Sequence, residues 1–190
     1  EIREAASAPH GPLPEGHYPG PCLRLTDRER QAKKAGGRPP ALRVRAGAVR
    51  VDFTDELLGP YDGVVDDFVV RRNDGAHAYN LAVVVDDGFQ GIGQVVRGVD
   101  LLDSTPRQIW LARALDLPVP RFAHVPLVLG PDGARLAKRH GAVTLRDVAP
   151  GKALQWMAQT LGLPGDTPQE MLAGFDPQRL PREATRFEGA

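Results

Sequence analysis

The segment at residues 130–147, GPDGARLAKRHGAVTLRD, concentrates positive charge on a flexible backbone framed by Gly130, Gly133 and Gly141. Its cationic side chains are Arg135, Lys138, Arg139, Arg146 and, when protonated, His140. Lys138 is a compact charge on a long stem, which suits a phosphate. Such a loop can neutralise the charge that develops when a phosphoanhydride breaks, provided that it closes over the nucleotide. The alternative is a solvated basic turn without a ligand.

Two further runs carry polar side chains next to apolar segments. In VVRGVDLLDSTPRQ, residues 95–108, Arg97 leaves an apolar segment, Gly98 permits a bend and Asp100 follows. An arginine at a strand end, where open α/β sheets place ligands, is suited to grip a carboxylate through two hydrogen bonds. The alternative is a structural ion pair between Arg97 and Asp100. In AYNLAVVVDD, Tyr79 precedes an apolar run that ends in two aspartates.

Charge is unevenly distributed, although the formal net charge is zero. Residues 21–50 hold nine Lys and Arg against two Asp and Glu, whereas residues 51–67 hold six acids and no base. This pattern fits either a surface that meets a polyanion on one side or two solvated loops. The only cysteine is Cys22, which excludes an internal disulfide and favours a cytoplasmic setting. We expect no contact with a membrane, because no run is long and apolar enough to span one.

The elements that position these residues begin after a Pro-rich and Gly-rich loop. Residues 25–35 are compatible with a helix. The alternation from Leu42 to Phe53 predicts a β-hairpin that turns near Gly47. Strands are expected at 64–70 and 81–85, and the second of these is apolar enough to be buried in a parallel sheet.

The second half of the chain mixes helix and strand signals. A helix should begin near Thr105, which can cap it, with Pro106 in its first turn and Gln108 completing a capping box. A strand is predicted at 123–129, and short helices at 151–190. Strand, helix and strand in succession indicate an α/β layer architecture.

Three motifs resemble the catalytic domain of class I glutamyl-tRNA synthetases. YNLAVVVDD resembles the family's YNFAVVVDD, and VVRGVDLLDSTPRQ resembles its RGEDHLSNTPRQ. RLAKRHGAV resembles KLSKRHGAV, a form of the KMSKS signature, except that Arg135 replaces the first Lys and Ala137 the first Ser. The resemblance implies an α/β fold, the C-terminal part of a Rossmann-type catalytic domain. Residues 1–63 would form a zinc-type insertion and acceptor-like subdomain, 64–150 the second half of the catalytic domain, and 151–190 a short helical segment.

The opening segment, EIREAASAPHGPLPEGHYPGPC, is similar to the zinc-binding insertion of a truncated paralogous family, the glutamyl-queuosine tRNA(Asp) synthetases. In that family zinc is held by a Cys-x-Cys pair, then by a Tyr and by a Cys four residues later. Tyr18 and Cys22 match that spacing, whereas the upstream pair would precede Glu1. Only 51 residues follow Arg139, too few for the anticodon-binding region of a full glutamyl-tRNA synthetase.

The resemblance also implies a reaction and its site residues. The family activates L-glutamate with ATP, and the paralogous family transfers it to queuosine in the anticodon loop of tRNA(Asp). By this resemblance Tyr79 and Arg97 bind glutamate, and Lys138 is the catalytic residue that binds the ATP phosphates. The remaining ATP-binding positions would be Arg135, Arg139, Gly98 and Asp100. ATP, Mg²⁺ and Zn²⁺ are the expected cofactors, and the expected form is a cytoplasmic monomer.

Two other interpretations stay open. The chain can be a fragment of a glutamyl-tRNA synthetase that charges tRNA(Glu), or a nucleic-acid-binding module of the same fold without catalysis. The family's HIGH-type motif is not found in these 190 residues. We therefore expect the chain by itself to be inactive in ATP–pyrophosphate exchange, while the protein from which it comes is an enzyme.

Overall fold

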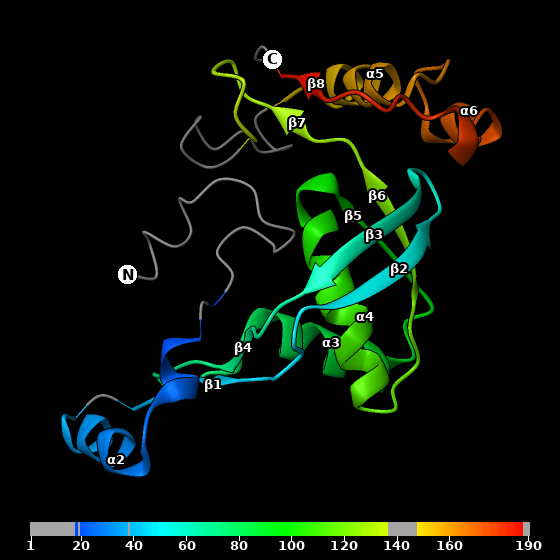
Figure 1. The fold of residues 1–190 in the computed structure, drawn as a ribbon. Coiled ribbons are helices and arrows are strands. Elements are labelled where there is room, and N and C mark those ends of the chain that lie inside the picture. The colour runs from blue at the N-terminus through cyan, green and yellow to red at the C-terminus, as the bar shows by residue number, and fades with distance from the viewer. Residues whose placement is uncertain (1–17, 19, 38, 137–147, 188–190) are drawn as a thin grey trace. The chain divides into compact units, whose positions relative to one another are not determined.

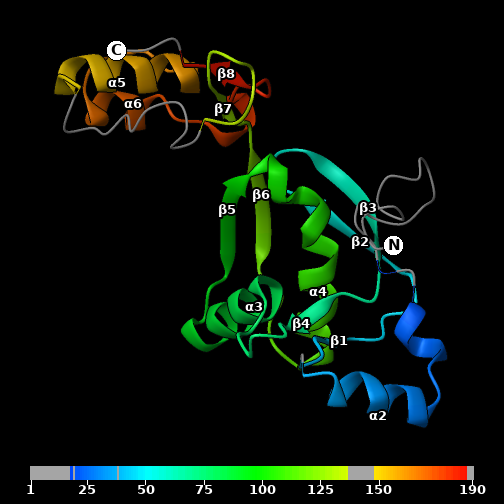
Figure 2. The same ribbon diagram turned by 90° about the vertical axis from the view of Figure 1, so that its left-hand side faces the viewer.

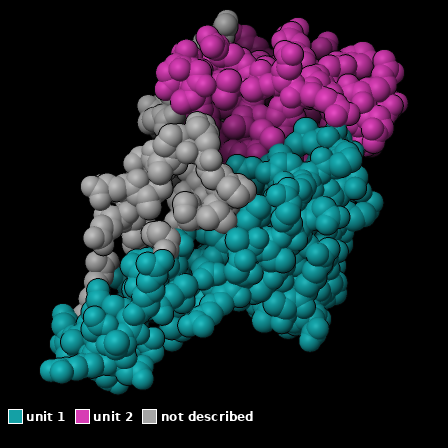
Figure 3. Space-filling view, in the orientation of Figure 1, with its two compact units in different colours: residues 1–95, 101–122 teal, residues 96–100, 123–190 magenta. Residues whose placement is uncertain are grey.

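The computed structural model describes residue 18 and residues 20–37, 39–136 and 148–187, and they group into two compact units (Figures 1 and 3). Unit 1 comprises residues 1–95 and 101–122, and unit 2 comprises residues 96–100 and 123–190. The boundary crosses strands β5 (Gln94–Gly98) and β6 (Arg121–Val125), which pair with each other. How the predicted segments 1–63, 64–150 and 151–190 behave as domains remains a prediction.

Unit 1 combines short strands with α-helices and a short 3-10 helix among its described elements (Figure 2). In chain order they are η1 (Pro21–Arg24), α2 (Asp27–Ala35), β1 (Leu42–Arg43), β2 (Val49–Asp55), β3 (Gly59–Val65), β4 (Val69–Arg71), α3 (Tyr79–Gln90) and α4 (Thr105–Ala114). The α2 helix confirms the prediction for residues 25–35. It begins with a capping box, in which the Glu29 carboxylate accepts from the Thr26 backbone N–H at 2.8 Å and from the Thr26 hydroxyl at 2.7 Å. These hydrogen bonds lower the pKa of Glu29.

The predicted hairpin across Gly47 is wrong. Strand β2 pairs in antiparallel fashion with β3, with Val49 opposite Val65, whereas β1 pairs with β4. The β2–β3 turn is closed by the Asp55 carboxylate, which accepts from two successive backbone amides at 3.0 Å each. A turn does exist at Gly47, φ 68°, but it separates strands that pair elsewhere. Alternation alone identified strand segments without identifying their partners.

The prediction of a buried strand at 81–85 is also wrong, because these residues belong to α3. A five-residue apolar run fits a buried strand and one flank of a helix equally well. Here the helix continues through Gln90 and ends at Gly91, φ 68°, whose N–H donates to the carbonyls of Asp87 and Gly88. Val84 on this helix is buried in the core.

Helix α4 forms where it was expected, but its beginning differs from the prediction. The N-cap is Ser104, and Thr105 lies fully buried inside the first turn. Gln108 Nε2 donates to Asn80 Oδ1 on α3 at 3.1 Å. This side chain therefore makes a contact between helices that the local pattern did not predict.

The core of unit 1 lies between α4, α3 and the β2–β3 hairpin. Its buried apolar members are Val51, Val65, Phe68, Val84, Ile109, Leu111, Ala112 and Phe122. The predicted strand at 64–70 is interrupted at Asp66 and Asp67, so that β3 ends at Val65 and β4 begins at Val69. Asp66 is 5% exposed, and its carboxylate accepts from Arg107 Nε at 2.7 Å. The interruption thus places a buried ion pair against the core.

Unit 2 confirms the helices predicted near the C-terminus. Its further elements are β7 (Val128–Leu129), α5 (Pro150–Leu161), α6 (Pro168–Ala173), η4 (Pro177–Arg179) and β8 (Thr185–Arg186). Strand β7 pairs in parallel with β8, and Trp156 meets Phe187 edge-on with ring centroids 5.3 Å apart. The predicted strand 123–129 is present as two strands, β6 and β7. In the described part of the chain, no helix has the length and hydrophobicity needed to cross a bilayer.

Candidate functional site

The structure brings together three of the predicted ATP-binding residues in unit 2. Arg135 Nη1 donates to Asp100 Oδ2 and forms an ion pair with it. Gly98 lies beside the same carboxylate, because a Cβ at this position would stand 2.5 Å from Asp100 Oδ1 and 2.9 Å from Leu127 Cδ2. The position therefore requires a glycine if Asp100 is to stay where it is. The Arg135 side chain is 63% exposed and the Asp100 side chain 27%, so the pair is open to ligands in water.

The beginning of the basic loop is a tight hairpin that fixes Arg135. Gly130 and Ala134 are joined by a backbone hydrogen bond of 2.8 Å, and Leu136 N–H donates to the Val128 carbonyl at 2.8 Å. Gly133, φ 76°, makes the turn possible. Lys138 and Arg139 lie outside the described residues, as does Ala137. Their predicted contacts with the ATP phosphates therefore stay predictions.

Asp100 pairs with Arg135, whereas Arg97 hydrogen-bonds to a histidine. On β5, Arg97 Nε donates to His124 Nε2 on β6 at 3.0 Å. His124 is fully buried and Arg97 half-buried. The Nε end of the guanidinium is thus oriented by a hydrogen bond to a buried histidine.

Tyr79 is the first residue of α3 in unit 1 and is 54% exposed. The first turn that carries it is tied to α4, because Asn80 Oδ1 accepts from the buried Gln108 side chain. An exposed phenol on an anchored turn can donate a hydrogen bond to a ligand. Arg97, the other predicted glutamate-binding residue, belongs to unit 2.

The structure also brings together the two predicted zinc ligands. The Cys22 backbone N–H donates to the Tyr18 hydroxyl oxygen at 2.8 Å, and the cysteine is free and exposed. The Arg43 guanidinium lies over the Tyr18 ring, 4.1 Å from its centroid. Burial, followed by the hydrogen bond with Cys22, raises the pKa of Tyr18. Among the residues that the structure describes, no group of three or more His, Cys, Asp or Glu could hold a metal ion. Tyr18 and Cys22 lie close together, and their ligation of zinc stays a prediction.

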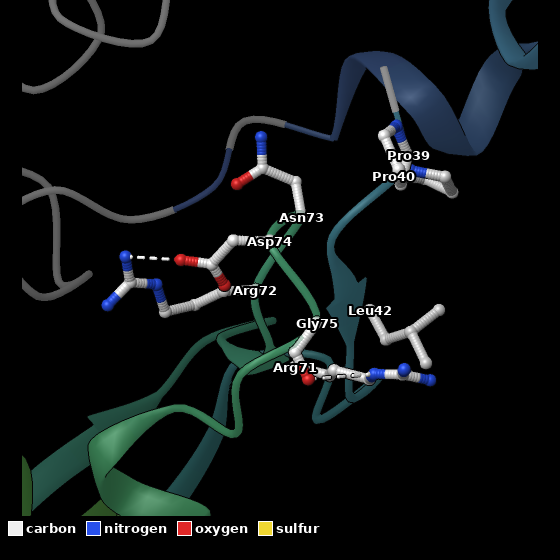
Figure 4. A pocket seen from close by; sticks show the side chains of 8 residues that line it. All are labelled: Pro39, Pro40, Leu42, Arg71, Arg72, Asn73, Asp74 and Gly75. Atoms are coloured by element: carbon white, nitrogen blue, oxygen red, sulfur yellow. Dashed lines mark hydrogen bonds and ion pairs between the residues drawn. The ribbon is translucent and has the colours of Figure 1, made fainter. Parts of the chain in front are cut away.

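Two pockets flank the β1–β4 pair in unit 1. One of about 600 Å³ is lined by Tyr18 and Cys22 together with Arg30, Lys33, Lys34 and Arg43. The other, of about 360 Å³, contains Arg71 and Arg72 (Figure 4). There the guanidinium groups are engaged by their own turn, since Arg72 pairs with Asp74 at 2.6 Å and Arg71 Nε donates to the Gly75 carbonyl at 3.2 Å. In the first pocket Arg30 also has a partner, Asp27 at 3.0 Å, so it is Lys33 and Lys34 that make this pocket the stronger candidate for an anionic ligand.

Sequence analysis missed two side chains that hold these candidate residues. Gln108 was expected only to cap its helix, and His124 was not among the candidate residues. The sequence contains one signal for His124, its place in the apolar run FAHVPLVL, where a buried polar group needs a partner. It contains no signal that Arg97 is this partner.

Comparison with known proteins assigns the fold and the candidate site to a class. The sequence profile of the family "tRNA synthetases class I (E and Q), catalytic domain" matches residues 1–171. The chain belongs to this family of class I aminoacyl-tRNA synthetases.

The similarity to individual proteins is more specific. The chain is 58% identical over 188 residues to a Glutamyl-Q tRNA(Asp) synthetase of Nocardia farcinica, with 96% of this chain and 60% of that protein covered. It is 50% identical over 200 residues to one of Symbiobacterium thermophilum, with 98% and 62% covered. The chain therefore spans about 60% of the length of these relatives.

A solved structure supports the fold. The glutamate-tRNA synthetase of Elizabethkingia anophelis superposes with a TM-score of 0.67 at 23% identity, which covers 88% of this chain and 40% of that one. At this level of identity the likeness concerns the fold alone.

Proposed function

We propose that the whole protein to which this chain belongs activates L-glutamate with ATP and transfers it to queuosine in the anticodon loop of tRNA(Asp). The observation that carries this proposal is the 58% and 50% identity, over nearly the whole chain, to two proteins named Glutamyl-Q tRNA(Asp) synthetase. Because the chain spans about 60% of their length, the activity is assigned to the whole protein. We place it in the cytoplasm, as a monomer, without contact with a membrane.

Glutamate would be held by Arg97 and Tyr79. Arg97 is oriented by a hydrogen bond to a neutral histidine and can give its charge to a substrate carboxylate. Tyr79 presents an exposed hydroxyl at the start of α3 and would donate a hydrogen bond. These two groups bind and orient the substrate, which is what adenylation requires from a protein that supplies no nucleophile.

ATP would lie against the base of the basic loop in unit 2. Gly98 allows the backbone to approach closely, and Arg135 carries an exposed charge that can exchange Asp100 for a phosphate oxygen. Lys138 is the proposed catalytic residue, and Arg139 the second cation beside it. Mg²⁺ would arrive with the ATP phosphates and neutralise part of their charge.

The RNA and the zinc ion would both use the N-terminal part of unit 1. Tyr18 and Cys22 would be two zinc ligands of a structural site, completed by residues that precede this chain. Lys33, Lys34 and Arg30 line the adjacent pocket and can contact an RNA backbone through its phosphates. Within the basic stretch 21–50, Arg45 is exposed and could also follow the RNA backbone, whereas Arg50 pairs with Asp62.

Glutamate-dependent ATP–pyrophosphate exchange by the full-length protein tests the activation step. We expect exchange with L-glutamate and none with the 190-residue chain alone. Transfer of labelled glutamate to tRNA(Asp) carrying queuosine tests the second step, with tRNA(Asp) that lacks queuosine and tRNA(Glu) as matched controls. Charging of tRNA(Glu) instead of tRNA(Asp) would contradict the proposed acceptor.

A further inference from the structure

The contact between Arg97 and His124 carries an inference beyond the residues already assigned. We propose that His124 is a positioning residue, which fixes the guanidinium of Arg97 in the orientation that receives a carboxylate of glutamate. The proposal rests on the proposed function, since it gives Arg97 the role of binding glutamate. It assigns to His124 no contact with the substrate.

The chemistry of the hydrogen bond defines the state of the imidazole. Arg97 Nε–H is the donor at 3.0 Å, so His124 Nε2 must offer a lone pair. In a neutral imidazole the proton then lies on Nδ1, and this tautomer is assigned from the hydrogen bond. A protonated imidazole would turn an N–H towards the guanidinium and lose the bond. His124 is thus used as a neutral acceptor beside a permanent cation.

Burial makes this acceptor rigid. His124 has no exposed surface, and its β6 neighbours Phe122 and Ala123 are 4% and 5% exposed. A buried side chain on a paired strand has few accessible rotamers, whereas an exposed arginine has many. The hydrogen bond to this rigid side chain therefore limits the rotamers that the half-buried Arg97 side chain can adopt.

The choice of nitrogen also determines which edge of Arg97 faces a ligand. A guanidinium can grip a carboxylate with two parallel hydrogen bonds either through Nε and one Nη or through both Nη atoms. Because Nε donates to His124, the edge that uses Nε is not open to a substrate carboxylate. An aspartate or glutamate at position 124 would instead neutralise Arg97 and weaken its attraction for the substrate.

A satisfied core histidine is the competing explanation, and it predicts a different set of effects. If His124 only fills the core, its replacement should lower stability and leave the apparent affinity for glutamate unchanged. If it orients Arg97, its replacement should raise the KM for glutamate more than the KM for ATP. A comparison of the KM for glutamate with the KM for ATP therefore distinguishes the two explanations.

The test uses the full-length protein and three substitutions on β6. His124→Leu removes the acceptor, and we expect the KM for glutamate to rise about tenfold, as for the loss of one charge-assisted hydrogen bond, with the KM for ATP within about twofold. His124→Gln restores an acceptor near the position of Nε2, and it should bring the KM for glutamate back to within about threefold of the wild type. Phe122→Leu is the matched control, since it disturbs a buried β6 residue and should change only the melting temperature.

The outcomes separate this proposal from the proposed function. If the wild type exchanges with glutamate and His124→Leu has the same KM for glutamate, the positioning role is refuted while the activity stands. If the wild type shows no glutamate-dependent exchange, the proposed function fails and the role of His124 fails with it. Equal rises in the KM values for glutamate and ATP would point to a general loss of structure and would also overturn the proposal.

Discussion

Two ion pairs, one in each unit, use the same chemistry in different surroundings. In unit 1, Asp66 and Arg107 have side-chain exposures of 6% and 18%, and the pair lies against the core with Arg107 near the Phe68 ring. In unit 2, Asp100 and Arg135 have exposures of 27% and 63% and lie at the base of the basic loop. The first pair is part of the packing, whereas the second can exchange its partner for a ligand.

The difference shows how exposure separates a charge that the core holds in place from one that water or a ligand can reach. A buried carboxylate that loses its partner cannot be hydrated, so the pair is held in place by the cost of breaking it. An exposed pair gains little from its attraction, and water or a phosphate can replace either partner at small cost. The residue types alone therefore do not show whether an Asp–Arg pair belongs to the packing or can exchange a partner for a ligand. Four measurements test how buried and exposed polar groups differ.

The largest effect is expected for Asp66→Ala. It leaves Arg107 largely buried without its carboxylate, and we expect the free energy of unfolding to fall by about 3 kcal/mol. Asp100→Ala is the matched control in the exposed pair and should cost less than about 1 kcal/mol. Urea unfolding of the full-length variants measures both. Equal losses would show that burial does not distinguish the two pairs.

A glycine in the packed part of unit 1 can be compared with a glycine beside the exposed ion pair. In each case substitution by alanine adds one methyl group. At Gly63 a Cβ would lie closer than 3.0 Å to the Pro106 ring, which cannot rotate away, and Gly63→Ala should cost about 2 kcal/mol. At Gly98 the Cβ would meet the ends of the Asp100 and Leu127 side chains, which can move. Gly98→Ala should therefore cost about 1 kcal/mol and mainly raise the KM for ATP. A larger loss of stability at Gly98 than at Gly63, measured by thermal unfolding, would reverse the comparison.

Arg135→Ala tests whether the exposed pair serves the nucleotide. We expect the KM for ATP to rise about fivefold, because one cation near the phosphates is lost, and the free energy of unfolding to change by less than about 1 kcal/mol. Arg135→Lys keeps the charge and should recover part of the loss. An unchanged KM for ATP in exchange assays of the alanine variant would remove Arg135 from the site.

The smallest effect concerns Tyr61, whose hydroxyl donates to Asp103 Oδ1 at 2.5 Å in unit 1. Burial and this hydrogen bond raise the pKa of Tyr61 to about 12, while an unfolded tyrosine titrates near pH 10. The stabilisation is complete below pH ~10 and is lost as the pH rises towards ~12, because the unfolded state releases the proton first. Urea unfolding of the wild type and Tyr61→Phe across this range measures it. If the difference in the free energy of unfolding between the two proteins does not change with pH, the fold does not hinder ionisation of the Tyr61 hydroxyl.

The sequence by itself determined the family motifs, the helices at 25–35 and near the C-terminus, and the candidate residues Arg97, Arg135 and Tyr79. Helix α2 was predictable because its capping box, Thr26 with Glu29, lies within four successive residues. The same holds for α6, where Thr167 and Glu170 form the box. Signals of this kind are local, so they survive without knowledge of the fold.

Only the tertiary structure decided which segments pair and which side chains meet. The run 81–85 became a helix because its apolar flank packs on α4, and the Gln108 side chain donates to Asn80 across the α3–α4 contact. The partner of Arg97 is 27 residues away in sequence, on the neighbouring strand, and no spacing rule connects the two. Periodicity records that a residue faces something apolar, whereas the identity of its neighbour depends on strand pairing and packing between distant segments.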